Sequence, residues 1–61
     1  MTVAEAIKKA VETGNAAMAG VAADALRNRG WDYEAIYQTA KRFTGVSPAD
    51  WEALMYESEV T

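Results

Sequence analysis

Three glycines divide this chain into four short segments of similar length. Gly14, Gly30 and Gly45 lie 16 and 15 residues apart, and each follows a run with helical periodicity. Glycine adopts the left-handed backbone conformation that ends many helices, because it has no β-carbon. Helix-forming residues dominate the composition and no three β-branched residues are consecutive, so the spacing predicts an all-α fold.

The starts of the helices are marked as well as their ends. Each helical run follows a residue whose side chain can accept a hydrogen bond from the first backbone N–H groups. These residues are Thr2, Asn15, Asp32 and Ser47. We therefore predict four helices joined by short loops, as one domain over residues 1–61: a three-helix core crossed by a fourth, amphipathic helix. The predicted ranges are 3–13, 16–29, 33–44 and 48–58.

Apolar residues recur at helical spacing in the second and third segments, which predicts the faces that form the core. The face predicted for the second segment contains Met18, Val21, Ala22, Ala25 and Leu26. The face predicted for the third contains Tyr33, Ile36, Tyr37, Ala40 and Phe43. We expect Tyr33 and Tyr37 at the rim, because a phenol hydroxyl needs a partner or solvent.

Gly20 lies inside the second predicted helix, where glycine costs about 1 kcal/mol relative to alanine. Together with Ala16 and Ala23 it forms a face of small residues that lets another backbone approach closely. One interpretation is packing against the first or third helix of the same chain. The other is self-association, which would make the protein a structural homo-oligomer.

The last predicted helix carries two apolar stripes on nearly opposite sides, at about 100° per residue. The first contains Trp51, Leu54, Met55 and Ser58, and the second contains Ala49, Ala53, Tyr56 and Val60. Acidic residues separate the stripes: Asp50 and Glu57 on one edge, Glu52 and Glu59 on the other. A bundle this small can cover one stripe, so we expect the second to face solvent or a partner.

Charge is distributed unevenly along the chain. Residues 46–61 contain four acidic and no basic residues, whereas residues 1–45 contain five acidic and six basic ones, which together give the net charge of −3. An acidic helix attracts a basic protein surface. We therefore predict a non-catalytic protein-interaction module, such as a regulatory or accessory subunit or an inhibitor. The predicted partner-binding residues are Tyr56, Val60 and Ala53, with Glu52, Glu57 and Glu59 at the rim.

The composition excludes most catalytic chemistry. The chain has no His and no Cys, which removes the usual general base, the thiolate nucleophile and the commonest metal ligands. The two carboxylates on each edge of the last predicted helix, Asp50 with Glu57 and Glu52 with Glu59, lie two helical turns apart. This is roughly 10 Å along the axis, which is too far to share a proton. We predict no enzyme activity, no cofactor and no metal site.

The sequence contains no sign of a membrane or secretion segment. No apolar run approaches the length of about 20 residues that a helix needs to cross a membrane, and no secretion signal is visible. We therefore expect a cytoplasmic protein.

A helix-turn-helix-like DNA-binding homodimer is the alternative prediction. Arg27, Arg29, Lys41 and Arg42 would cluster if the second and third helices ended side by side. The net negative charge argues against nucleic acid as a partner.

Residues 41–51 add one resemblance to this alternative. The basic pair Lys41-Arg42 and the segment Gly45-Val46-Ser47-Pro48-Ala49-Asp50-Trp51 resemble the C-terminal end of AraC-type DNA-binding domains, which implies DNA binding. The match covers about eleven of the 61 residues. The rest of that domain, with its two reading helices, does not fit in this chain, so we assign no DNA binding from it.

Overall fold

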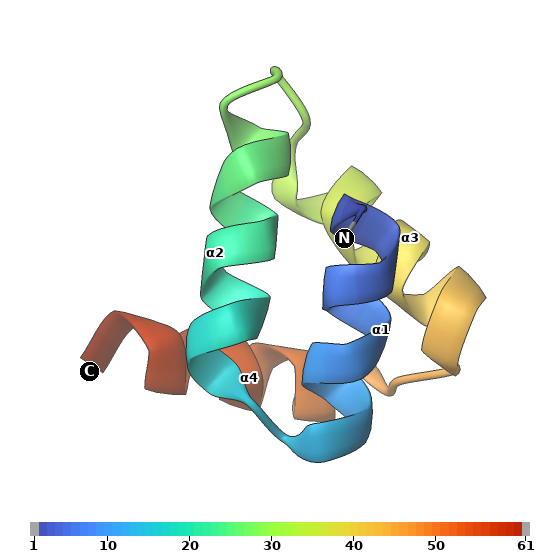
Figure 1. Ribbon diagram of the computed structural model, residues 1–61, viewed down its shortest axis with the longest axis vertical. Helices are drawn as coiled ribbons and strands as arrows, with labels where there is room; N and C mark the ends of the chain where they lie inside the picture. The colour runs from blue at the N-terminus through green and yellow to red at the C-terminus, as the bar shows by residue number, and fades with distance from the viewer. Residues whose placement is uncertain (1, 61) are drawn as a thin grey trace.

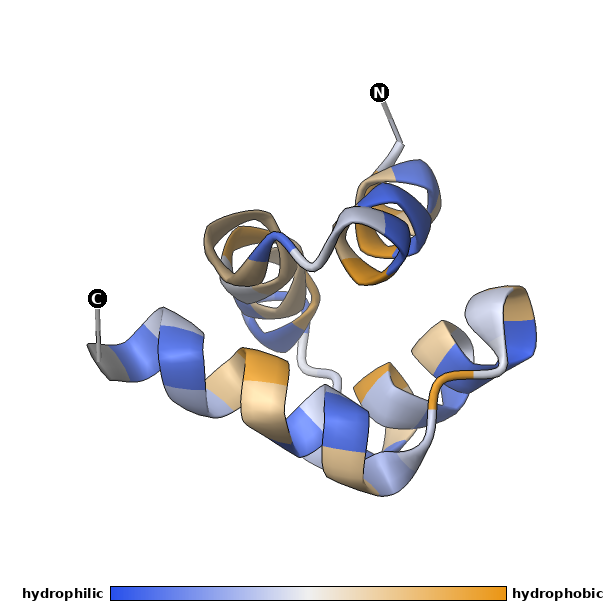
Figure 2. Cartoon of the chain, turned by 90° about the horizontal axis from the view of Figure 1, so that it is seen from below, coloured by the Kyte–Doolittle hydropathy of each residue, from blue (hydrophilic) through white to orange (hydrophobic). Residues whose placement is uncertain are grey.

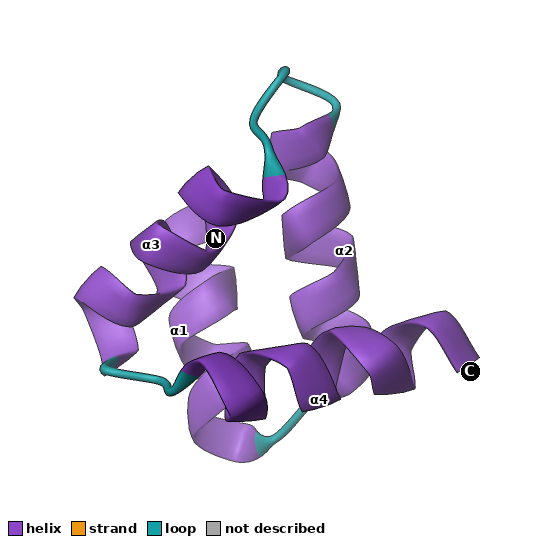
Figure 3. Cartoon of the chain, turned by 180° about the vertical axis from the view of Figure 1, so that it is seen from behind, coloured by secondary structure: helices purple, strands orange, loops and turns teal. Residues whose placement is uncertain are grey.

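The computed structural model describes residues 2–60 as four helices joined by short loops. They are α1 (Val3–Thr13), α2 (Ala16–Arg27), α3 (Tyr33–Thr44) and α4 (Pro48–Val60). The antiparallel helices α1 and α2 pack on each other, α3 packs mainly on α1, and α4 packs mainly on α2 (Figure 1). Seen from behind, α4 crosses the end of the α1–α2 pair that carries their connecting turn (Figure 3). The predicted all-α architecture is confirmed, and residues 2–60 contain no strand.

The predicted helix caps are confirmed at all four starts. The side chains of Thr2, Asn15 and Asp32 accept hydrogen bonds from the backbone N–H three residues later, at 3.1, 3.0 and 2.8 Å. Ser47 does the same for Asp50 at 3.2 Å. Capping satisfies N–H groups that have no partner within the helix, which fixes where each helix begins.

Small side chains make up much of the core. Trp51, Ile7 and Ile36 are the largest fully buried side chains, and five of the eleven buried apolar residues are alanines. Alanine lets helices approach closely, because it places only a methyl group between two backbones. The most hydrophobic segments of α1 and α4 face the space between the helices (Figure 2).

The second helix ends earlier than predicted. It stops at Arg27, and Asn28 caps it in a right-handed conformation. Gly30, with φ of +91°, lies in the following turn instead of directly ending the helix. By contrast, Gly14 and Gly45 end α1 and α3 in the left-handed conformation, as predicted.

The buried face of α2 agrees with the prediction only in part. Ala22 and Leu26 are buried as predicted, but Val21, also expected in the core, is 72% exposed. Ala23, expected on the opposite side, is buried, and so is Ala19. The reason is that α2 packs between α1 and α4. The two neighbours together cover its small residues and leave Val21 outside.

The prediction for α3 is correct except at Phe43 and Tyr37. Ile36 and Ala40 are buried and Tyr33 is 42% exposed, as expected for a rim residue, but Phe43 is 47% exposed. Because α3 packs mainly on α1, its two ends remain uncovered. Tyr37, expected at the rim, is instead buried and donates a hydrogen bond from its hydroxyl to the Val46 carbonyl at 3.0 Å.

Candidate functional site

The fourth helix has one inward and one outward apolar face. Trp51 is fully buried, and Leu54, Met55 and Ser58 are half-buried on the same side. On the other side Ala49, Ala53 and Tyr56 are exposed, and Tyr56 is 69% exposed. We call Ala49, Ala53 and Tyr56 the outer stripe. Val60 is the last residue of α4, but its side chain lies outside the described part of the chain.

Carboxylates flank the outer stripe on both edges. Glu52 and Glu59 lie on one edge, Asp50 and Glu57 on the other, and all four residues are exposed. Asp50 in the first turn also favours the helix itself, since the N-terminal end of a helix carries partial positive charge. The result is an exposed tyrosine on an acidic helix that carries no basic residue.

One of these carboxylates affects the neighbouring helix. Burial raises the pKa of the Tyr33 phenol, and the negative charges of Glu52 and Glu34 raise it further. The acidic edge of α4 therefore acts electrostatically on the start of α3.

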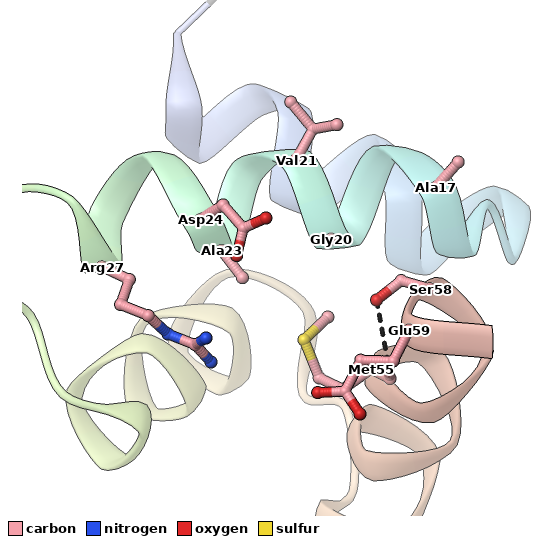
Figure 4. Close-up of a pocket in the computed structure, with 9 residues that line it drawn as sticks. All are labelled: Ala17, Gly20, Val21, Ala23, Asp24, Arg27, Met55, Ser58 and Glu59. Carbon is pink, nitrogen blue, oxygen red and sulfur yellow. Dashed lines mark hydrogen bonds between the residues drawn. The ribbon is translucent and has the colours of Figure 1, made fainter. Parts of the chain in front are cut away.

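A groove lies on each side of α4. The larger, of about 550 Å³, lies between α4 and α2, and Val21, Arg27 and Glu59 are among the residues that line it (Figure 4). The smaller, of about 310 Å³, lies between α4 and the C-terminal end of α1. The residues that line the smaller groove are Val11, Gly14, Val46, Asp50, Ala53, Leu54 and Glu57. The sequence prediction missed this groove, although the seven-residue spacing of Asp50 and Glu57 placed both on one edge.

The small-residue face of α2 packs within the chain. Ala23 is buried and Ala16 half-buried, while Gly20 lies directly against Ser58. The helix that approaches is therefore α4, and the expectation of α1 or α3 as the partner of Gly20 was wrong. Self-association through Ala16, Gly20 and Ala23 stays a prediction. Ala23 would contribute little surface to such an interface, because it is already buried within the chain.

The four basic residues proposed to meet DNA are not brought together. Arg27 ends α2 and Arg29 follows it, while Lys41 and Arg42 lie in the last turn of α3. The third helix starts near the C-terminal end of α2 and runs away from it (Figure 1). Its 12 residues span roughly 18 Å, which separates the two basic pairs.

The described residues contain no group of three or more His, Cys, Asp or Glu side chains that could hold a metal ion. Ser47 accepts a helix-capping hydrogen bond, and Ser58 donates one to the Met55 carbonyl at 2.8 Å (Figure 4). Both hydroxyls thus have structural roles. Among the described residues no helix is long and apolar enough to cross a membrane.

Comparisons with protein-family models, with curated proteins and with solved structures give no significant match for this chain.

Proposed function

We propose that this chain is a non-catalytic protein-interaction module, acting as a small regulatory or accessory subunit or as an inhibitor. It docks on a partner protein through the outer stripe of α4. The observation that carries the proposal is the exposure of Tyr56, at 69%, on a regular helix whose opposite side is anchored by the fully buried Trp51.

Tyrosine is well suited to an interface. It buries a large ring with only two side-chain torsions to fix, and its hydroxyl tolerates both water and a polar partner. Ala53 lies one helical turn before Tyr56, so a partner can approach the helix closely beside the ring. The helix is already formed in the free chain, which lowers the entropy cost of binding.

The flanking carboxylates define the partner's chemistry. Glu52 and Glu59 on one edge and Glu57 on the other surround the stripe with negative charge. A basic surface would be drawn to it and would associate faster at low salt, whereas an acidic surface would be repelled. A docking surface of this kind consists of an apolar centre with a charged rim.

Affinity purification from the native cells tests the proposal with one substitution and a matched control. Tyr56→Asp places a charge in the centre of the stripe, and Val21→Asp makes a similar change at an equally exposed position on α2. We expect wild type and Val21→Asp to capture the same proteins, and Tyr56→Asp to lose them. All three chains should keep the same helical circular dichroism, because neither side chain is in the core.

Equal capture by Tyr56→Asp and wild type would show that the outer stripe is not the docking surface. Loss of capture by Val21→Asp alone would place the interface on α2 instead.

A further inference from the structure

The groove between α1 and α4 combines an apolar floor with carboxylates at its edge. Val46 is buried, and Val11 and Leu54 are half-buried, so the floor is aliphatic. Asp50 and Glu57 line the same groove from α4. Seven residues of helix separate them, which places them roughly 10 Å apart along the axis.

A second source of negative potential comes from α1. The groove lies at the C-terminal end of that helix, where the aligned peptide dipoles leave partial negative charge. The last turn of α1 contains no basic residue, unlike the last turns of α2 and α3, which contain Arg27 and Lys41-Arg42. No Lys or Arg is among the described residues that line the groove.

The other groove beside α4 has a different character. There Arg27 lies with Asp24 and Glu59, so positive and negative charges partly offset each other (Figure 4). By contrast, the charged residues that line the groove between α1 and α4, Asp50 and Glu57, are both acidic.

We propose that the groove between α1 and α4 receives a lysine or arginine side chain from the partner, an inference that rests on the proposed function. The aliphatic stem of such a side chain packs on Val11 and Leu54, while its charged head stays at the wet edge beside Asp50 and Glu57. Ala53 belongs both to the outer stripe and to the groove. A partner seated on the stripe is thus positioned to insert this side chain.

Titration of the ¹⁵N-labelled protein with acetyl-arginine amide, followed by NMR, tests the chemistry directly. The control probe is acetyl-citrulline amide, which has nearly the same shape but no charge. We expect the arginine probe to shift the amide signals of Gly14, Val46 and Ala53, and the citrulline probe to bind at least several-fold more weakly. Equal binding of the two probes, or shifts confined to other helices, would overturn the proposal.

Substitutions separate the two edges of α4. Asp50→Asn should weaken binding of the arginine probe about threefold, as expected for a partly exposed ion pair, and the double variant with Glu57→Gln about tenfold. Glu52→Gln, on the opposite edge, is the matched control and should leave the affinity unchanged. An affinity that falls equally in Glu52→Gln would mean that net charge alone attracts the probe, and the groove assignment would be wrong.

Partner capture distinguishes this inference from the proposed function. If Tyr56→Asp abolishes capture but the Asp50→Asn, Glu57→Gln variant captures as wild type does, the groove assignment fails and the docking stripe stands. If Tyr56→Asp has no effect, the docking stripe fails, and the inference that the partner inserts its side chain beside it fails as well.

Discussion

Gly20 of α2 and Ser58 of α4 approach so closely that residue 20 has no room for a side chain. A β-carbon on residue 20 would lie 2.7 Å from the Ser58 β-carbon and 2.8 Å from its hydroxyl oxygen. Non-bonded carbon atoms pack best at about 3.5–4.0 Å, so a side chain at position 20 would force the helices apart. The glycine that weakens α2 as an isolated helix is therefore what allows α4 to pack against it.

This contact predicts that Gly20→Ala destabilises the protein even though alanine is the better helix former. Overpacking a close contact costs about 1–3 kcal/mol, against about 1 kcal/mol gained in helix propensity. We expect a net decrease of about 1 kcal/mol in the free energy of unfolding, measured by urea denaturation. Because the obstructing atoms belong to Ser58, the same Gly20→Ala change should be stabilising in a Ser58→Gly background. Stabilisation by Gly20→Ala in the wild-type chain would contradict the placement of α4 on α2.

The Tyr37 hydroxyl links α3 to the loop before α4. It donates to the buried Val46 carbonyl at 3.0 Å, so Tyr37→Phe would leave that carbonyl without this partner. We expect Tyr37→Phe to lower the free energy of unfolding by about 1 kcal/mol. The matched control is Tyr33→Phe, at an exposed position on the same helix, which should change stability by less than about 0.5 kcal/mol. Equal effects of the two substitutions would show that the Tyr37 hydrogen bond contributes nothing.

The four helix starts and the ends of α1 and α3 could be predicted from the sequence because caps are local. Ser47 bonds to the N–H of Asp50, three residues away, and Gly45 needs only its own backbone to end α3. The two stripes of α4 were readable for the same reason, since acids at fixed helical spacing separate them. In each case the deciding interactions lie within a few residues of one another.

The buried face of α2 was predicted only in part from the sequence, because it depends on which helices pack there. Half of the helix is alanine, so its periodicity marks no face strongly, and Val21 itself lies where no neighbour covers it. Likewise the groove beside α4 needs Val11 from α1 and Leu54 from α4, which lie far apart in sequence. Its acidic edge was visible in the sequence, but the apolar floor arises only when α4 crosses the end of α1.

Tyr33 provides a pH-dependent test of the position of α4 relative to α3. Burial raises the pKa of its phenol, as do the negative charges of Glu52 and Glu34 and the neighbouring Tyr37. The unfolded chain loses this proton first, at a pH of about 10. The contribution of Tyr33 to stability is therefore fully present below that pH and is lost as the pH rises through the higher pKa of the folded state, because the folded chain then holds more protons than the unfolded one.

Glu52→Gln should lower the pKa of Tyr33, measured as tyrosinate absorbance against pH and assigned by difference from Tyr33→Phe. Glu59→Gln, two turns further along the same edge of α4, serves as the control and should leave that pKa unchanged. If Glu52→Gln also leaves it unchanged, the start of α4 does not lie beside Tyr33.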